Sequence, residues 1–133
     1  MQTVFDKKIF LVDDDSFLTS SLEKVLNNVG YKNIEIYPTG KRCMKFIKNN
    51  PEIIFLDFHL DDEMDGIEGL KRIKGYSQDI QVIFTTSMEC VVLAIKSIKL
   101  GASDFLLKKD ISEKEVELII NKITHENFEK LLN

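Results

Sequence analysis

Two hydrophobic patterns alternate along this chain, and their alternation restricts its fold more than any other feature. Five short apolar runs, rich in β-branched residues, have the length and continuous hydrophobicity of strands that are covered on both faces. These runs are residues 9–12, 34–36, 53–56, 80–84 and 104–107. Each is followed by a segment with helical spacing. Strands that alternate with helices predict a parallel sheet between two layers of helices.

The predicted helices are defined by apolar residues at intervals of three and four. In the first, an apolar stripe covers 18–29, and Gly30 follows it as a natural stop. In the last, Ser112 and Glu115 have the spacing of a capping box. The five helices are expected at 18–29, from 39 onward, at 67–73, at 91–98 and from 112 toward 131. Residues 91–95 are all apolar; because a helix buries only one face, the surplus indicates either loose packing or a docking surface.

Length and composition indicate one globular domain. The chain has 133 residues, 44% hydrophobic and 30% charged, so we expect a single domain over 1–133 with a core at about 7–125. Its net charge of −4 lacks the basic surplus that nucleic acids and anionic lipids attract, and no apolar run reaches the ~18 residues of a membrane span. We therefore expect no direct binding to nucleic acid or membrane. Cys43 and Cys90 form no disulfide framework and are interpreted as small apolar residues of a reduced, cytoplasmic protein.

Polar residues directly follow four of the five predicted strands. They are the acids 13–15 after the first strand, Asp57 after the third, the hydroxyl residues 85–87 after the fourth, and Lys108 with Lys109 after the fifth. Parallel sheets of this kind carry their sites at the carboxyl ends of the strands, beside the point where the strand order reverses. We therefore expect these groups to lie together at one edge of the sheet.

Such a cluster has the chemistry that phosphoryl transfer requires. Carboxylates brought together repel each other, and a divalent cation relieves the repulsion. Oxygen ligands suit Mg²⁺, which binds one or two carboxylates and phosphate oxygens while keeping several waters. A lysine and a threonine on the far side would hold the other phosphoryl oxygens. The carboxylate of Asp57 would then attack phosphorus and become an acyl phosphate.

The segments that carry these groups resemble those of the receiver domain of two-component response regulators. The matching segments are 11–15, 54–60, 65–66, 82–87 and 101–108. The likeness extends from about Lys8 to the last helix, and the order and spacing of the segments make it specific. It implies a single receiver domain with a flavodoxin-like three-layer α/β sandwich. In that fold a five-stranded parallel sheet has the order 2-1-3-4-5 and is flanked by five helices.

The resemblance implies a role for each polar position. Asp57 would accept the phosphoryl group from a phosphohistidine of a sensor histidine kinase or phosphotransfer protein. The ligands of Mg²⁺ would be Asp13 (directly or through a water), Asp14, Asp57 and the main-chain carbonyl of His59. Thr86 and Lys108 would contact the phosphoryl oxygens, and Phe105 occupies the position of the aromatic residue whose rotamer follows Thr86.

These roles imply a signalling protein and not a conventional enzyme, because the chain would catalyse only its own aspartyl phosphorylation and dephosphorylation. The phosphoryl group would change the surface formed by the fourth helix, the fifth strand and the fifth helix, where a downstream protein would bind. The resemblance also allows a homodimer.

Two positions depart from the family pattern. Proline is usual after Leu60 and after Lys108, but this chain has Asp61 and Lys109 there. The second replacement puts in doubt a cis peptide bond after Lys108, because a cis bond before a residue other than proline costs ~3 kcal/mol. The acidic run 61–63 is expected in a loop beside the metal site.

The sequence leaves two other functions open. A small phosphatase of the haloacid dehalogenase type would use Asp13 and Asp15 as a strand-end acid pair, although the chain has no room for the usual cap insert and Asp57 would have no role. A receiver-like interaction module that is never phosphorylated is the other alternative, although none of the key acids is missing. The residues alone do not decide whether Lys108 or Lys109 faces the acids; the assignment to Lys108 is implied by the spacing of the family.

Overall fold

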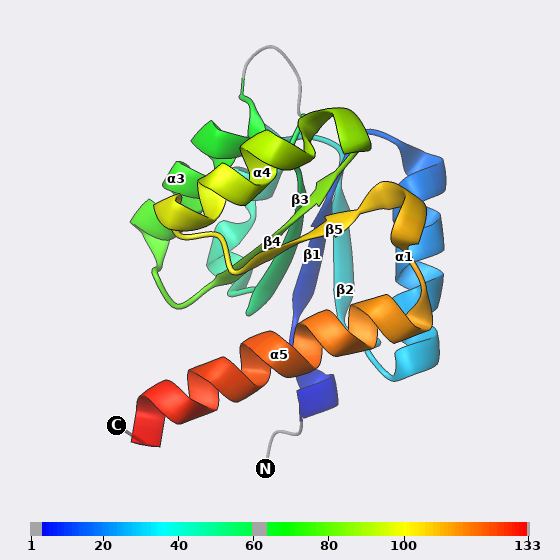
Figure 1. The fold of residues 1–133 in the computed structure, drawn as a ribbon, viewed down its shortest axis with the longest axis vertical. Coiled ribbons are helices and arrows are strands. Elements are labelled where there is room, and N and C mark those ends of the chain that lie inside the picture. The colour runs from blue at the N-terminus through cyan, green and yellow to red at the C-terminus, as the bar shows by residue number, and fades with distance from the viewer. Residues whose placement is uncertain (1–3, 60–63, 133) are drawn as a thin grey trace.

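A parallel sheet with helices on both faces forms the framework (Figure 1) of the computed structural model, which describes the backbone of residues 4–59 and 64–132 and the side chains of 5–59 and 64–125. The strands are β1 (Ile9–Val12), β2 (Ile34–Tyr37), β3 (Ile53–Asp57), β4 (Gln81–Thr86) and β5 (Asp104–Leu107). The α-helices are α1 (Ser16–Val29), α2 (Gly40–Lys45), α3 (Gly66–Tyr76), α4 (Val91–Ser97) and α5 (Glu113–Leu132). Within the described residues the sheet has the order β2-β1-β3-β4-β5 with every pair parallel, so the expected fold is confirmed.

The two faces of the sheet are covered by different helices (Figure 1). Alternate residues of β1 point to opposite faces, so that Leu11 and Phe10 belong to separate buried clusters. The cluster with Leu11 includes Leu22 and Leu26 of α1 and Val116, Ile120 and Ile123 of α5. The cluster with Phe10 includes Cys43 of α2, Leu70 and Ile73 of α3 and Ala94 of α4. The continuous hydrophobicity of β1 and β3 is explained by burial on both faces.

Side-chain caps and one glycine set the ends of the helices. The carboxylate of Asp15 accepts hydrogen bonds from two main-chain N–H groups at the start of α1, and the carboxylate of Asp65 accepts one from the N–H of Glu68 at the start of α3. The hydroxyl of Ser112 accepts a hydrogen bond from the N–H of Glu115 at 3.2 Å, as the capping pattern predicts. Gly30 ends α1 with φ of 129°, a conformation that other residues rarely adopt.

Two strands extend beyond their apolar runs. β3 includes Asp57, and β4 begins one residue later than expected and continues to Thr86. The ladder pairs Asp57 with Thr85, and Thr86 with Leu107. Main-chain pairing does not depend on side-chain polarity, so the sheet continues into the polar segments. These side chains are therefore held by the rigid sheet and not by a loop.

Helix α4 differs most from the prediction. Only Ala94 of the expected apolar stripe is fully buried, whereas the exposed fractions of Val92, Leu93 and Ile95 are 59%, 54% and 48%. The α-helix has seven residues and passes into a 3-10 turn at Ile98–Leu100, which limits the face that it can bury. The surplus of apolar residues at 91–95 therefore lies on the surface. We call Met88, Val92, Leu93, Ile95, Ile98 and Leu100 the α4 apolar surface.

The structure also answers the predictions about the two cysteines and about the peptide bond after Lys108. Cys43 is buried, Cys90 is partly buried against the same core cluster, and both are free thiols. The described residues contain no cis peptide bond, so the bond between Lys108 and Lys109 is trans. No helix in the described part of the chain has the length and apolar content to span a membrane.

Candidate functional site

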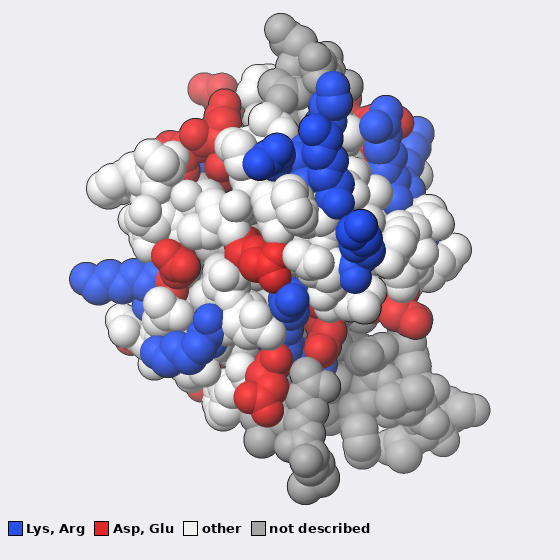
Figure 2. Space-filling view, turned by 180° about the vertical axis from the view of Figure 1, so that it is seen from behind, with Lys and Arg blue, Asp and Glu red and all other residues white. Residues whose placement is uncertain are grey.

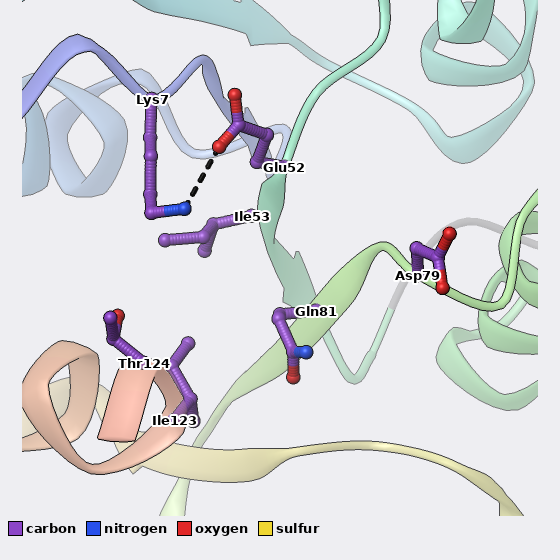
Figure 3. Close-up of a pocket in the computed structure, with 7 residues that line it drawn as sticks. All are labelled: Lys7, Glu52, Ile53, Asp79, Gln81, Ile123 and Thr124. Atoms are coloured by element: carbon purple, nitrogen blue, oxygen red, sulfur yellow. Dashed lines mark hydrogen bonds and ion pairs between the residues drawn. The ribbon is translucent and has the colours of Figure 1, made fainter. Parts of the chain in front are cut away.

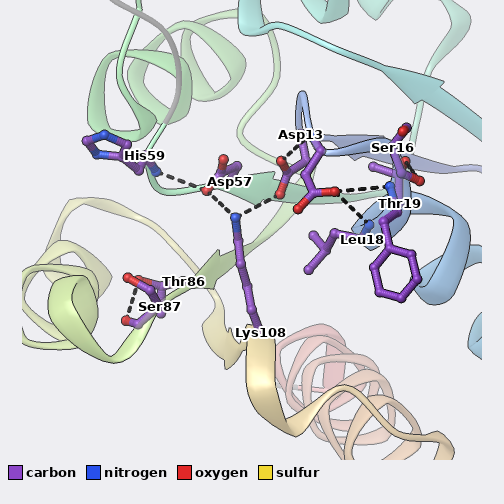
Figure 4. Close-up of polar contacts among 11 residues, drawn as sticks. Asp13, Ser16, Leu18, Thr19, Asp57, His59, Thr86, Ser87 and Lys108 are labelled. Atoms are coloured by element: carbon purple, nitrogen blue, oxygen red, sulfur yellow. Dashed lines mark hydrogen bonds and ion pairs between the residues drawn. The ribbon is translucent and has the colours of Figure 1, made fainter.

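The carboxyl ends of three strands bring acids and a lysine together (Figure 4). Asp13 directly follows β1, Asp57 is the last residue of β3, and Lys108 directly follows β5. Asp13 and Asp57 are buried, with 4% and 3% of their surface exposed, whereas Asp14 is exposed. The sequence prediction that these side chains share one edge of the sheet is therefore correct.

Lys108 lies between the two buried carboxylates. Its Nζ is 3.0 Å from Oδ2 of Asp13 and 3.2 Å from Oδ1 of Asp57. The side chain of Lys109 is exposed, and its Nζ lies 3.3 Å from Asp110. The structure thus settles which lysine faces the acids: it is Lys108.

Main-chain N–H groups hold one oxygen of each buried carboxylate. Oδ1 of Asp13 accepts a hydrogen bond from the N–H of Asp15 at 2.9 Å, and Oδ1 of Asp57 accepts one from the N–H of His59 at 3.1 Å. Oδ2 of Asp13 is buried and has no aligned hydrogen bond from any described residue, although the ammonium of Lys108 is close enough for an ion pair. This oxygen is therefore available as a ligand.

The electrostatics of the site follow from burial and from the closeness of the acids. Burial and the charge of Asp13 raise the pKa of Asp57 to about 6, and this value includes the opposing effects of the His59 N–H and of Lys108. Burial lowers the pKa of Lys108, but the nearby carboxylates of Asp13 and Asp57 outweigh this effect, so the pKa lies above its ordinary value. At neutral pH one ammonium therefore faces an ionised Asp57 and its acidic neighbours.

The donor set fits a hard divalent cation. One carboxylate oxygen from each of Asp13, Asp14 and Asp57 lies within 4.8 Å of the others. These oxygens face an open cavity, which leaves space for the waters that Mg²⁺ retains. The orphaned Oδ2 of Asp13 adds a ligand atom without losing a directed hydrogen bond. The residues present therefore fit a magnesium ion.

Neither Thr86 nor Phe105 is among the described residues that line this cavity. Thr86 is buried, and its hydroxyl donates a hydrogen bond to the main-chain oxygen of Ser87 at 3.2 Å (Figure 4). Phe105 is partly buried and packs against the core cluster on the α4 side of the sheet. Ser87 lines the cavity in the described part of the chain, whereas Thr86 does not.

The cavity beside the acid cluster is also lined by His59, which the sequence predicted, and by Glu89 and Cys90, which it did not. The ring of His59 is exposed, and its main chain lies beside Asp57. Glu89 and Cys90 line the cavity from the turn after β4, and sequence reasoning did not place them there. Their position only a few residues beyond the end of β4 was the available signal. The acidic run 61–63 lies outside the described residues.

A second cavity lies at the opposite end of the sheet. Lys7, Glu52, Asp79, Gln81 and Thr124 are among the residues that line it (Figure 3), and Nζ of Lys7 forms an ion pair of 2.9 Å with Glu52. Gln81 begins β4, so this cavity is at the amino edge, away from the acid cluster. Its charged groups do not converge on one point, and we assign it no chemistry.

Comparison with known proteins agrees with this geometry. The chain belongs to the response regulator receiver domain family, whose model matches residues 9–121. It is 28% identical over 119 residues to the chemotaxis protein CheY of Thermotoga maritima, covering 89% of this chain and 98% of that protein. It is 27% identical over 113 residues to CheY of Bacillus subtilis, covering 84% and 93%.

Solved structures show the same fold. A response regulator receiver domain protein from Clostridium thermocellum superposes with a TM-score of 0.81 at 22% identity, covering 96% of this chain and 99% of that one. The receiver domain of a putative Luxo repressor protein from Vibrio parahaemolyticus has a TM-score of 0.76 at 29% identity, covering 92% and 96%. The flavodoxin-like fold expected from the resemblance is thus confirmed.

Proposed function

We propose that this chain is a phosphorylation switch in which Asp57 accepts a phosphoryl group from a phosphohistidine in a Mg²⁺-dependent reaction. The donor is a sensor histidine kinase or a phosphotransfer protein. The observation that carries the proposal is the convergence of three carboxylates within 4.8 Å, with Lys108 in contact with two of them. This combination of ligand, nucleophile and cation suits phosphoryl transfer, which depends on positioning and charge neutralisation.

In the proposed reaction each residue of the acid cluster has a separate role. The metal would be held by Asp13 (directly or through a water), Asp14, Asp57 and the main-chain carbonyl of His59. When bound, Mg²⁺ neutralises the charge that develops on the phosphoryl oxygens. An oxygen of Asp57 forms a bond to phosphorus while the bond from phosphorus to the donor's imidazole nitrogen breaks, and that nitrogen keeps the electron pair. Lys108 then turns from the carboxylates to an oxygen of the bound phosphoryl group.

The switch would follow from Thr86. Its hydroxyl exchanges the carbonyl of Ser87, which it contacts at 3.2 Å, for a phosphoryl oxygen. Phe105 then turns into the space that Thr86 leaves. The new contacts of the phosphoryl group favour this second arrangement, and a ligand shifts an equilibrium only through such a difference. The surface of α4, β5 and α5 changes with it, and the α4 apolar surface becomes part of the docking site for a downstream protein.

The haloacid dehalogenase alternative is not favoured. It requires the carboxylate of Asp15 to act with Asp13, but the exposed Asp15 accepts hydrogen bonds from Phe17 and Leu18 as the cap of α1. We propose instead that the only chemistry is phosphorylation and dephosphorylation of Asp57. The location of such a switch, beside its intracellular phosphodonor, would be cytoplasmic.

Mass spectrometry after incubation with acetyl phosphate and Mg²⁺ tests the proposal. The expected result is one added phosphoryl group, labile to alkali, on the peptide that contains Asp57. Asp57→Asn removes the label, and Asp15→Asn, which preserves the cap of α1, keeps it. Label that survives alkali, or that persists in Asp57→Asn, would contradict the assignment. A receiver-like module that is never phosphorylated would take up no label at all.

A further inference from the structure

The start of α3 contacts the main chain that directly follows the acid cluster. The N–H of Gly66 donates a hydrogen bond to the main-chain oxygen of Phe58 at 3.1 Å. Gly66 is buried and is the first residue of α3, where a main-chain N–H has no acceptor within the helix. Phe58 comes directly after Asp57, the proposed phosphoacceptor. This hydrogen bond therefore joins the end of a helix to the segment that carries the site.

The peptide group between Phe58 and His59 links this hydrogen bond to Asp57. Its carbonyl oxygen, which belongs to Phe58, accepts the hydrogen bond from Gly66. Its N–H, which belongs to His59, donates to Oδ1 of Asp57 at 3.1 Å (Figure 4). Because a peptide group is planar, its C=O and its N–H cannot turn independently. The direction of the Phe58 oxygen therefore sets the direction of the hydrogen bond that Asp57 receives.

Residue 66 must be a glycine for a steric reason. A Cβ atom there would lie 2.6 Å from the oxygen and 2.7 Å from the Cα of Phe58. These are main-chain atoms, which cannot move aside like the end of a flexible side chain. Phe58 is also held by the sheet, because its N–H donates to the carbonyl of Thr85 at 2.9 Å and its ring packs edge-on against Phe84. A side chain at residue 66 would therefore strain the peptide group that orients Asp57.

From these contacts, we propose that Gly66 is a positioning residue for the metal and phosphoacceptor site and acts through the peptide group between Phe58 and His59. The hydrogen bond from His59 holds the carboxylate of Asp57 in place before a ligand arrives. Groups that hold metal ligands in place raise the affinity for the metal. Gly66 lies outside the acid cluster, and its role rests on the proposed function, because Mg²⁺ and the phosphoryl group are the ligands that Asp57 would bind.

Amide hydrogen exchange, followed by NMR on the metal-free full chain, tests the link between Gly66 and His59. In Gly66→Ala the amide of His59 should exchange about threefold to tenfold faster than in the wild type, the ratio expected for the loss of one hydrogen bond. Gly75→Ala is the matched control, because it is the same replacement in the same helix and a Cβ at residue 75 meets no atom within 4 Å. It should leave the exchange of His59 unchanged.

Isothermal titration calorimetry with MgCl₂ tests the consequence for the site. Gly66→Ala should bind Mg²⁺ about tenfold more weakly than the wild type. Ile73→Ala separates this effect from a loss of stability, because Ile73 is buried on α3 about two turns beyond Gly66 and its truncation removes core packing. It should keep the wild-type affinity. None of the three replacements alters the charged side chains of the surface, one face of which is seen in Figure 2, so net charge cannot cause a difference.

A reciprocal experiment does not require Gly66→Ala to fold. Asp57→Ala removes the acceptor of the His59 N–H, which leaves the peptide group free to turn. The amide of Gly66 should then exchange about threefold faster or more in the metal-free protein. Asp14→Ala is the matched control, because it removes an exposed acid of the same cluster, and it should leave the exchange of Gly66 unchanged.

Four results would each overturn the proposal. The first two are equal exchange of the His59 amide in the wild type and Gly66→Ala, and a Gly66 amide that does not respond to Asp57→Ala. The others are an unchanged Mg²⁺ affinity in Gly66→Ala, and an equal loss of affinity in Ile73→Ala, which would reduce the effect to the stability of α3. The exchange measurements need neither metal nor phosphoryl group. A chain that takes up no label from acetyl phosphate would therefore contradict the proposed function without changing the outcome at Gly66.

Discussion

The ammonium nitrogen of Lys108 lies 3.2 Å from Oδ1 of Asp57, the residue that we propose as phosphoacceptor. The same nitrogen is 3.0 Å from Asp13, so a single positive charge contacts two buried carboxylates. With Asp14 beside them, the cluster keeps a surplus of negative charge that favours a divalent cation. Lys108 thus stabilises the resting site, and in the proposed switch it would also contact the phosphoryl group.

Replacing Lys108 should destabilise the protein in a way that Mg²⁺ corrects. Lys108→Ala leaves two buried carboxylates without their partner, and we expect the free energy of unfolding to fall by about 2 kcal/mol, less than for a fully buried pair because the lysine is partly exposed. Mg²⁺ should restore most of this loss. Urea unfolding with and without MgCl₂ measures both effects. Lys109→Ala, at an exposed position, should change stability by less than about 0.5 kcal/mol. Equal losses in the two variants would contradict the bridging role of Lys108.

The raised pKa of Asp57 predicts a dependence of stability on pH. In the folded protein this pKa is about 6, against an ordinary value of 3.8. Between these values the folded state holds a proton that the unfolded chain has released, so the free energy of unfolding falls as the pH rises through this window. Above pH 6 the full penalty is present. Asp57→Asn should therefore be more stable than the wild type at neutral pH without Mg²⁺, by about 1–3 kcal/mol.

Urea unfolding of both proteins from pH 4 to pH 8 checks this prediction. The difference between wild type and Asp57→Asn should grow up to about pH 6 and then stay constant. Asp14→Asn is the matched control, because Asp14 is exposed and its replacement removes the same charge. A constant difference across the whole pH range would show that burial does not penalise the charge on Asp57.

Metal binding should depend on Asp13 but not on Asp15. Asp13→Asn removes a buried carboxylate whose Oδ2 lacks an aligned hydrogen bond, and we expect the affinity for Mg²⁺ to fall by about tenfold or more. Asp15→Asn retains a good cap for α1 and should bind Mg²⁺ as the wild type does. Isothermal titration calorimetry measures both. A similar loss of Mg²⁺ affinity in the two variants would show that the metal does not bind at the carboxyl ends of β1 and β3.

Short-range patterns were sufficient to predict the strands and the acid cluster, whereas the strand order of the sheet was implied only by the family resemblance. Continuous apolar runs predict doubly covered strands, and a parallel arrangement then brings the residues after β1, β3 and β5 to one edge. The sequence could not choose between Lys108 and Lys109, because that choice depends on the direction in which the chain leaves β5. The orientation of the Thr86 hydroxyl toward Ser87 was equally inaccessible, because it depends on a side-chain rotamer.

For α4 the sequence predicted the helix and its surplus of apolar residues, but not which of these residues are buried. Apolar spacing indicated an inward stripe, but the helix is short and packs mainly through Ala94 and Ser97. Periodicity reports which residues share a helix face and does not report how much of that face the sheet can cover. In α1, by contrast, the longer helix buries Leu22 and Leu26 as its stripe predicts.

The exposed position of the α4 side chains predicts that polar replacements there leave the fold intact. Val92→Ser and Leu93→Ser remove side chains that are 59% and 54% exposed, so the free energy of unfolding should change by less than about 0.5 kcal/mol. Leu70→Ala, at a fully buried position on α3, should cost about 2–5 kcal/mol. Urea unfolding compares the three variants.

Size-exclusion chromatography of the phosphorylated protein adds a functional test. If the α4 apolar surface joins two copies of the chain, both serine variants should reduce the dimer. If it binds a different downstream protein, they should leave the oligomeric state unchanged and weaken that complex. A loss of stability close to that of Leu70→Ala would show instead that α4 is packed into the core.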